Sequence, residues 1–89
     1  MKIAGLEWDD VNAEHIARHM VTPLEVEDVC FGQHIAYAGE NNRYILYGQT
    51  ESGRYLKVVM ARLRKNLFRP ITAFEMSDSE KHSYRKKLR

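Results

Sequence analysis

The apolar residues of this chain follow a helical spacing up to about Gln33 and a strand-like spacing after it. In the first part, an apolar stripe recurs at intervals of three and four residues, which is typical of one helix face. The stripe consists of Ala13, Ile16, Ala17 and Met20. Asp9 and Asp10 precede it, where carboxylates cap the free N–H groups of a helix start. We therefore expect a first helix that begins at these two residues.

Two capping patterns predict two further helices. In Thr22-Pro23-Leu24-Glu25, a threonine N-cap precedes a proline at the first helical position and a capping-box glutamate. This helix should run to about Phe31 and end at Gly32. Ser77-Asp78-Ser79-Glu80 repeats the capping box and predicts a weakly packed C-terminal helix through about Lys87. The basic residues at its end are Arg85, Lys86, Lys87 and Arg89.

Between these helices the sequence predicts strands separated by turn residues such as Gly39-Glu40-Asn41-Asn42 and Glu51-Ser52-Gly53. The expected strands are His34–Ala38, Arg43–Thr50, Arg54–Arg62 and Leu67–Glu75, with Leu6-Glu7-Trp8 as a short strand or an extended segment. Arg54–Arg62 is partly apolar on both faces and should be central, whereas Pro70 indicates an edge or a bulge. We expect one α+β domain over residues 1–89, with an antiparallel meander of three to four strands.

Charge is distributed unevenly along the chain. Residues 1–42 carry eight acidic and two basic side chains, a formal charge of −6, whereas residues 43–69 carry seven basic and one acidic, a formal charge of +6. The net charge of +2 hides this polarity. A basic sheet surface that binds RNA is one interpretation. The alternative is a solvated surface whose charge is neutralised by the other half of the chain.

Basic and aromatic residues alternate in this segment, as in Arg43-Tyr44, Arg54-Tyr55 and Phe68-Arg69. Arginine holds phosphates and aromatic rings stack on unpaired bases, so the pattern is typical of single-stranded RNA binding. A strand's alternation places Arg54, Arg62 and Arg64 on one face and Lys57 on the other. Snorkelling side chains on a solvated sheet face are the competing interpretation.

Metal and thiol chemistry have little support in the sequence. His15 and His19 share a helix face at a spacing that suits two metal ligands, but Ile16 replaces the glutamate of the catalytic zinc motif. Cys30 is the single cysteine and is expected to be a buried, inert thiol. Trp8 is expected to anchor the core. No apolar run is long enough to span a bilayer, and without a signal-peptide core we expect a cytoplasmic protein.

Several short motifs stand in a specific order along the chain. They are Trp8-Asp9; Glu14-His15-Ile16-Ala17-Arg18-His19 with Val21-Thr22-Pro23 and Glu25; Gly48-Gln49-Thr50 with Gly53-Arg54; Arg69-Pro70-Ile71-Thr72-Ala73; and Met76-Ser77 with Glu80 and Tyr84. This ordered set resembles the BrnT-type toxins of bacterial type II toxin–antitoxin systems, which have a RelE-like fold. The sequence departs from the family at Phe74, where arginine is typical, and at Gln49, where arginine or lysine is frequent.

The resemblance implies an endoribonuclease that cleaves mRNA without a metal or another cofactor and so inhibits translation. It implies a DNA-binding antitoxin encoded nearby, and it leaves open a homodimer or a dimer of toxin–antitoxin heterodimers. No membrane partner is implied. The residues assigned to catalysis are Arg54, Arg62, Tyr84 and His15, and those assigned to RNA binding are Trp8, His19, Arg43, Lys57, Arg64 and Arg69. Phe74 and Gln49 remove cations from the expected active face, which predicts weak cleavage.

Two other functions are consistent with the sequence. A toxin-like module without catalytic activity would bind its partner protein and help to regulate its own operon, and the phenylalanine at position 74 favours this alternative. A duplex-DNA binder is the other candidate, although no predicted helix combines a basic face with a recognition-helix turn. An adjacent reading frame for a ribbon-helix-helix-like protein would identify the system.

Overall fold

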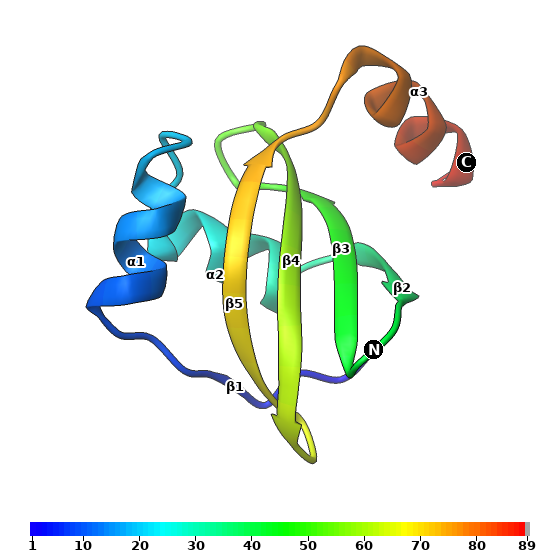
Figure 1. Cartoon of the computed structure of the whole chain (residues 1–89). Coiled ribbons are helices and arrows are strands. Elements are labelled where there is room, and N and C mark those ends of the chain that lie inside the picture. Colours follow the sequence, from blue (N-terminus) through cyan, green and yellow to red (C-terminus); the bar gives the residue numbers. More distant parts are fainter. Residues whose placement is uncertain (89) are drawn as a thin grey trace.

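A computed structural model describes residues 1–88 of the chain and shows a twisted five-stranded sheet with helices on both sides (Figure 1). In chain order the strands are β1 (Gly5–Leu6), β2 (His34–Ala38), β3 (Arg43–Gln49), β4 (Tyr55–Arg64) and β5 (Leu67–Glu75). Their order in the sheet is β1-β5-β4-β3-β2, which makes β4 the central strand as predicted. Strands β2 to β5 form an antiparallel meander, whereas β1 pairs with β5 in parallel.

This architecture confirms the predicted α+β class and corrects the number of strands. Three to four strands were expected in the meander, and Leu6-Glu7-Trp8 was expected to be a short strand or an extended segment. The meander has four strands, and β1 adds a fifth at the edge of β5. Only two residues of β1 pair, Gly5 with Leu67 and Leu6 with Phe68, so its sequence carries almost no strand periodicity. Pro70 lies at a register shift where Met60 pairs with Pro70 and Val59 with Thr72, which confirms the predicted bulge.

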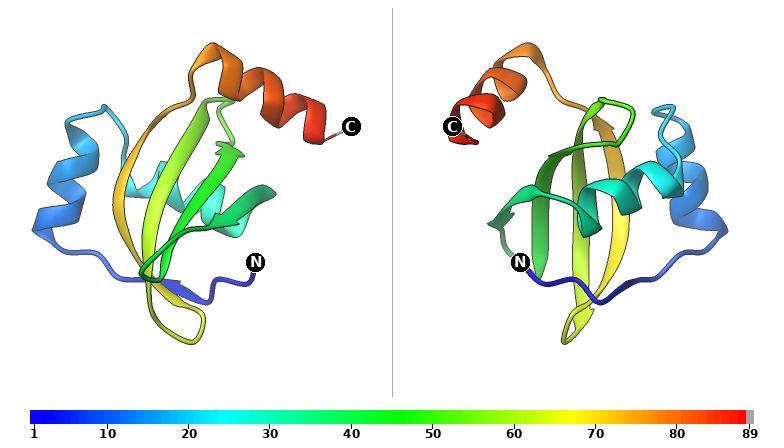
Figure 2. Two further views of the ribbon diagram at one scale, coloured as in Figure 1. Left: turned by 45° about the vertical axis from the view of Figure 1, so that its right-hand side comes forward. Right: turned by 180° about the vertical axis from the view of Figure 1, so that it is seen from behind.

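The three helices begin and end close to where their caps predict. They are α1 (Asp10–Ala17), α2 (Pro23–Phe31) and α3 (Asp78–Lys87). Thr22 with Glu25, and Ser77 with Glu80, form the two expected capping boxes, and Asp9 forms another with Asn12. Helix α1 lies beside the β5 edge and α2 crosses one face of the sheet, whereas α3 lies on the opposite face (Figure 2). Arg89, part of the predicted basic end, lies outside the described residues.

The predicted apolar stripe of the first helix is wrong at its C-terminal end. Met20 is 81% exposed and lies beyond α1, with a φ of 60°. The helix closes there because the Val21 N–H donates to the Ile16 carbonyl, an arrangement that requires a left-handed residue between them. The buried positions are Ile16 and the polar Asn12, whose Nδ2 donates to the carbonyls of Glu7 and Pro70. Hydrogen bonds to the β5 edge thus replace part of the expected apolar contact.

The two faces of the sheet carry different side chains. The core lies under α2, where Leu46, Leu56 and Val58 are fully buried against Val26 and Val29. Gly48 permits this close approach, since a Cβ atom there would lie 2.8 Å from Cγ1 of Val29. On the opposite face, the strand register aligns a row of side chains across the sheet, and Glu80 of α3 accepts hydrogen bonds from two of them. This row consists of Ile35, Tyr47, Lys57 and Phe74.

Three other sequence-based expectations can be compared with the structure. Cys30 is buried, and burial raises the pKa of its thiol to about 12, which confirms an inert cysteine. Trp8 packs against the core while remaining partly exposed. Among the described residues, no helix has the length and apolarity to cross a membrane, and no cluster of three or more His, Cys, Asp or Glu side chains is arranged to hold a metal ion.

Candidate active site and basic surface

Most of the residues predicted to act on RNA lie in two groups, one at each end of the sheet. One group surrounds Phe74 near the end of β5, at the upper end in Figure 1, and we name it the Phe74 cluster. Its members are His15, His19, Arg54, Lys57 and Phe74. The other group lies near the β4–β5 hairpin, at the lower end, and we name it the lower basic cluster. Its members are Arg43, Arg62 and Arg64.

The side chains of the Phe74 cluster come from α1, its C-terminal turn, strands β4 and β5, and the loop residue just before β4. The His19 ring lies 5.5 Å from the Phe74 ring and 6.0 Å from the His15 ring, centroid to centroid. Nζ of Lys57 lies 5.1 Å from the centre of the same Phe74 ring. An open cavity of about 520 Å³ is lined by His19, Met20, Arg54, Phe74 and Glu75. The His19 imidazole and the Lys57 ammonium therefore lie beside the Phe74 ring, the His15 ring lies next to His19, and the Arg54 guanidinium lines the same cavity as Phe74.

Arg54 is the most strongly bound cation of this cluster. Its Nη1 donates to both carboxylate oxygens of Glu25, at 3.0 and 2.9 Å, and to the Met20 carbonyl at 2.8 Å. Its Nη2 donates to Glu75 at 2.9 Å. The hydrogen bonds that Arg54 donates to Glu25 and Glu75 raise its pKa, so the side chain is a permanent cation held between two carboxylates. It fixes the turn after α1 against the ends of α2 and β5.

Lys57 also has a carboxylate partner. As predicted, it projects from the face opposite Leu56 and Val58, and its Nζ donates to Oε2 of Glu80 at 2.9 Å. The Tyr47 hydroxyl donates to the same oxygen at 3.2 Å. Hydrogen bonds from the Ser77 N–H and from Lys57 lower the pKa of Glu80 to about 2. The charge of Lys57 is therefore balanced near neutral pH, and Glu80 joins α3 to the sheet.

The lower basic cluster has a different environment. Arg43 is the partner of Ala61 in the β3–β4 register, and the Arg62 N–H donates to the Asn42 carbonyl, so the start of β3 lies beside the end of β4. The Arg62 guanidinium lies over the rings of Tyr44 and Phe68, 5.4 Å from each centre. All three arginines are exposed, and within residues 1–88 none of them forms an ion pair with a carboxylate.

The predicted common face of Arg54, Arg62 and Arg64 does not form one site. Arg54 and Arg62 have the same parity along β4, but eight residues separate them, which is about 26 Å at 3.3 Å per residue. A register shift between Arg62 and Arg64 also interrupts the alternation before Arg64 is reached. A single phosphate cannot contact both Arg54 and Arg62 across this distance.

The three remaining predicted residues lie outside both clusters. Arg69 donates to both carboxylate oxygens of Asp9, at 2.7 and 3.1 Å, and this lowers the pKa of Asp9 to about 2. Trp8 precedes that N-cap and is partly buried. Tyr84 is 4% exposed and packs edge-on against Tyr55, and burial raises the pKa of its phenol. Tyr84 therefore anchors α3 to the sheet in this structure.

Sequence reasoning missed the carboxylates that surround the cations. Glu25 and Glu80 were recognised only as capping-box residues, yet each also holds a basic residue of the Phe74 cluster. The partners stand 29 and 23 residues apart, so no local pattern could pair them. The sequence did offer one signal: a capping glutamate uses one carboxylate oxygen for the cap and leaves the other free to bind a cation. Which cation it binds depends on the register of the sheet.

The fold is similar to that of a bacterial toxin of known structure. The crystal structure of the Brucella abortus ribonuclease toxin BrnT, solved at 1.1 Å resolution, matches this chain with a TM-score of 0.68. The match covers 83% of this chain and 97% of that chain, at 14% sequence identity. No family model matches the sequence, and no curated protein matches it. The resemblance to BrnT-type toxins read from the sequence is thus confirmed for the fold, and this chain has a BrnT-like α+β architecture.

Proposed function

We propose that this protein is the toxin of a bacterial type II toxin–antitoxin system and inhibits translation by cleaving mRNA. The observation that carries the proposal is the similarity of its fold to the ribonuclease toxin BrnT over most of both chains. The unpaired arginines of the lower basic cluster add a surface that attracts a polyanion. In this role the protein acts in the cytoplasm, where mRNA is translated.

The proposed reaction uses the RNA's own 2′-hydroxyl and requires no metal. A base removes the proton of the 2′-hydroxyl, and that oxygen attacks the adjacent phosphorus. The bond to the 5′-oxygen breaks as an acid protonates it, which leaves a 2′,3′-cyclic phosphate and a 5′-hydroxyl. We assign proton transfer to His19, whose ring lines the cavity beside Phe74, and to His15, whose ring lies 6.0 Å from the His19 ring. Imidazole both accepts and donates protons near neutral pH.

The cations have separate roles in this proposal. Lys57 and Arg54 face the reacting phosphate, but each is already bound to carboxylates, so both stabilise the extra negative charge only weakly. We assign Arg62, with Arg43 and Arg64, to binding of the RNA strand, because these exposed arginines form no ion pair within residues 1–88. Slow cleavage follows from this arrangement.

A second function, a toxin-like binding module without catalysis, has a specific observation in its favour. The two cations nearest Phe74 are held by Glu25, Glu75 and Glu80, and Phe74 itself supplies no charge. A module of this kind would bind the cognate antitoxin and contribute to repression of the operon without cutting RNA. The two functions differ in one measurable property, the cleavage of RNA by purified protein.

Cleavage of a single-stranded RNA in EDTA tests the main proposal. We expect slow cutting that stops when the nucleotide before the cut carries a 2′-deoxyribose, because the attacking oxygen is then missing. His19→Ala should reduce cutting about 100-fold or more, the usual contribution of a general acid or base. Lys2→Ala removes an exposed charge elsewhere and is the matched control. If folded wild-type protein leaves the RNA intact at high concentration, the binding-module function replaces the enzyme.

Expression in bacteria tests the partner. We expect the chain alone to slow growth and a co-expressed cognate antitoxin to restore it, because an acidic or amphipathic segment can cover the lower basic cluster and block RNA. Light scattering of the purified pair would distinguish a homodimer of the toxin from a dimer of heterodimers. Growth inhibition by the His19→Ala protein equal to that of the wild type would argue against RNA cleavage as the cause.

A further inference from the structure

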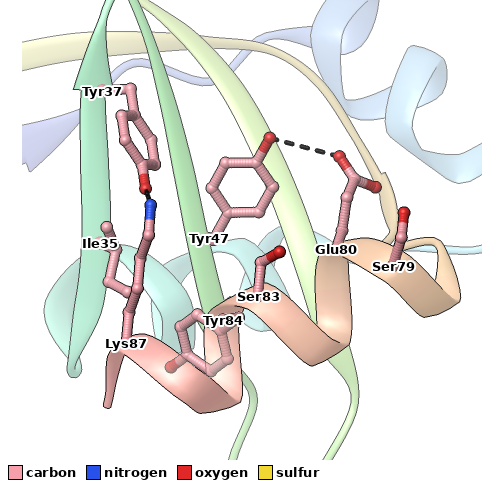
Figure 3. A pocket seen from close by; sticks show the side chains of 8 residues that line it. All are labelled: Ile35, Tyr37, Tyr47, Ser79, Glu80, Ser83, Tyr84 and Lys87. Atoms are coloured by element: carbon pink, nitrogen blue, oxygen red, sulfur yellow. Dashed lines mark hydrogen bonds between the residues drawn. The ribbon is translucent and has the colours of Figure 1, made fainter.

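A groove between α3 and the sheet is lined by aromatic side chains on the face that also carries Lys57 (Figure 3). We name it the tyrosine groove. Its volume is about 370 Å³, and its walls include the rings of Tyr37, Tyr47 and Tyr84. Ser83, Glu80 and Lys87 of α3 line its helical side.

The aromatic rings of the groove offer both faces and edges to a flat ligand. The rings of Tyr37 and Tyr47 stand 84° apart with centroids 5.8 Å from each other, so together they form a corner. A planar group that stacks on one ring meets the edge of the other, which is a favoured arrangement for aromatic pairs. Tyr37 is 40% exposed, although tyrosine usually buries most of its ring. This exposure leaves aromatic surface available to a ligand.

The polar groups of the groove suit a nucleotide. Nζ of Lys87, which lines the groove, lies 4.7 Å from the centre of the Tyr37 ring and contacts its hydroxyl. An ammonium in that position can bind a phosphate beside a stacked base. The Ser83 hydroxyl projects into the groove from the middle of α3 and can donate to or accept from a base edge (Figure 3).

The position of the groove relative to the Phe74 cluster is set by the sheet. Tyr47, Lys57 and Phe74 are direct neighbours on three adjacent strands, so Tyr47 lies about 10 Å from Phe74 at 4.8 Å per strand. Glu80 connects the two regions, because it accepts hydrogen bonds from both Tyr47 and Lys57. A base held in the groove therefore lies within about one nucleotide of a phosphate beside Lys57.

From this arrangement we propose that the tyrosine groove is a nucleobase-binding subsite that receives one unpaired base of the RNA next to the cleaved bond. The proposal rests on the proposed ribonuclease function and adds the part of the substrate that this face recognises. Stacking binds any base, and Ser83 together with Lys87 orients the nucleotide. A double-stranded RNA cannot place a base in the groove, so the substrate must be single-stranded.

A substitution that fills the groove is the sharpest test. Ser83→Leu places an apolar side chain in the groove while leaving its tyrosines and charges in place, and His82→Leu makes the same change on the neighbouring exposed position outside the groove. The probe is a fluorescent single-stranded RNA of seven nucleotides, intact or with one abasic position moved along it. We expect Ser83→Leu to weaken binding roughly 5- to 100-fold, the range of one lost base stack, and His82→Leu to leave it unchanged.

The abasic probes separate the subsite from the rest of the interface. For wild-type protein, one abasic position should weaken binding far more than the others, and Ser83→Leu should abolish that difference. Tyr37→Leu should act like Ser83→Leu, whereas Tyr37→Phe keeps the ring and should retain affinity. If the wild type binds and cuts RNA but all abasic probes bind equally, the subsite is wrong and the ribonuclease proposal stands. If the wild type neither binds nor cuts RNA, both proposals fail. Binding of a peptide of the partner protein in the groove, in place of a base, would also overturn the subsite.

Discussion

The two ends of the sheet carry similar numbers of cations but differ in the carboxylates that contact those cations. Around Phe74, Arg54 contacts two carboxylates and Lys57 contacts one. Near the β4–β5 hairpin, Arg43, Arg62 and Arg64 form no ion pair within the described part of the chain. The +6 charge of residues 43–69 is therefore not one surface. Formal charge counts groups, whereas an anion responds to the charge that neighbouring carboxylates leave uncompensated.

In the proposed cleavage of RNA, this contrast gives the two regions different roles. The lower basic cluster can attract and hold a phosphate backbone at long range. The Phe74 cluster has the two imidazoles and the neutralised cations, which suits proton transfer better than charge stabilisation.

The largest effect is expected from Phe74→Arg, which places an uncompensated cation in the Phe74 cluster. One positioned cation or donor contributes about 3–4 kcal/mol to a charged transition state, so cleavage should become roughly 100-fold or more faster. The measurement is the single-turnover rate on a defined RNA. Phe74 is only partly buried, so an arginine can extend towards solvent.

Phe74→Leu is the matched control, because it changes the packing around His19 and Lys57 without adding charge. Its rate should stay close to that of the wild type. A folded Phe74→Arg protein that binds RNA but cuts no faster would show that the Phe74 cluster does not surround the reacting phosphate.

The carboxylates that hold Arg54 should contribute unequally to stability. The side chain of Glu25 is 20% exposed and that of Glu75 is 59% exposed, so solvent screens the second ion pair more strongly. Glu25→Gln should lower the free energy of unfolding by about 1–2 kcal/mol, and Glu75→Gln by less than about 0.5 kcal/mol. Urea unfolding of both variants measures this difference, and equal losses would contradict the geometry of the pair.

The lower basic cluster should control the salt dependence of RNA binding. Each phosphate contact on a single strand contributes about 0.7 to the slope of log affinity against log salt concentration. Arg43→Ala with Arg62→Ala should therefore reduce the slope by about 1.4, whereas Arg54→Met should reduce it much less because carboxylates already neutralise Arg54. A larger slope change for Arg54→Met than for the double variant would reverse the assignment of the two ends.

The smallest effect concerns acid stability. The folded pKa of Glu80 is about 2, below its ordinary value of 4.5, so its stabilising contribution is complete above about pH 4.5 and is lost as the pH falls towards 2. Glu80→Gln should be less stable than the wild type at pH 6, by about 1 kcal/mol after screening, and the two proteins should converge near pH 2. Thermal unfolding at both pH values tests this. A stability difference between the two proteins that is the same at pH 6 and pH 2 would assign the effect to packing instead.

The elements that the sequence predicted well are those governed by near neighbours. Thr22 with Glu25 and Ser77 with Glu80 act within one helical turn, so their capping boxes were readable from spacing alone. The end of α1 was not readable, because Met20 adopts a left-handed conformation that commonly marks glycine. Arg54 holds that turn through the Met20 carbonyl, a contact between residues 34 positions apart.

The candidate site was likewise predictable only where near neighbours in the sequence determine it. Its residue types were identified from the alternation of basic and aromatic residues and from the family resemblance. Their grouping depended on the register of the sheet, which places Lys57 beside Phe74 and Arg62 at the far end of the same strand. The tyrosine groove was not foreseen at all, because Tyr37, Tyr47 and Tyr84 meet only when α3 packs across β2 and β3.

The separate roles of the two ends are tested most directly by single-turnover cleavage of one RNA at one salt concentration. The variants to compare are His19→Ala and the double variant Arg43→Ala, Arg62→Ala. The measurement gives a rate at saturating protein and a protein concentration for half saturation. We predict that His19→Ala lowers the saturating rate about 100-fold with little change in half saturation. The double variant should raise the half-saturating concentration several-fold and leave the saturating rate nearly unchanged. The opposite pattern, or an equal change of both quantities in both variants, would contradict the account.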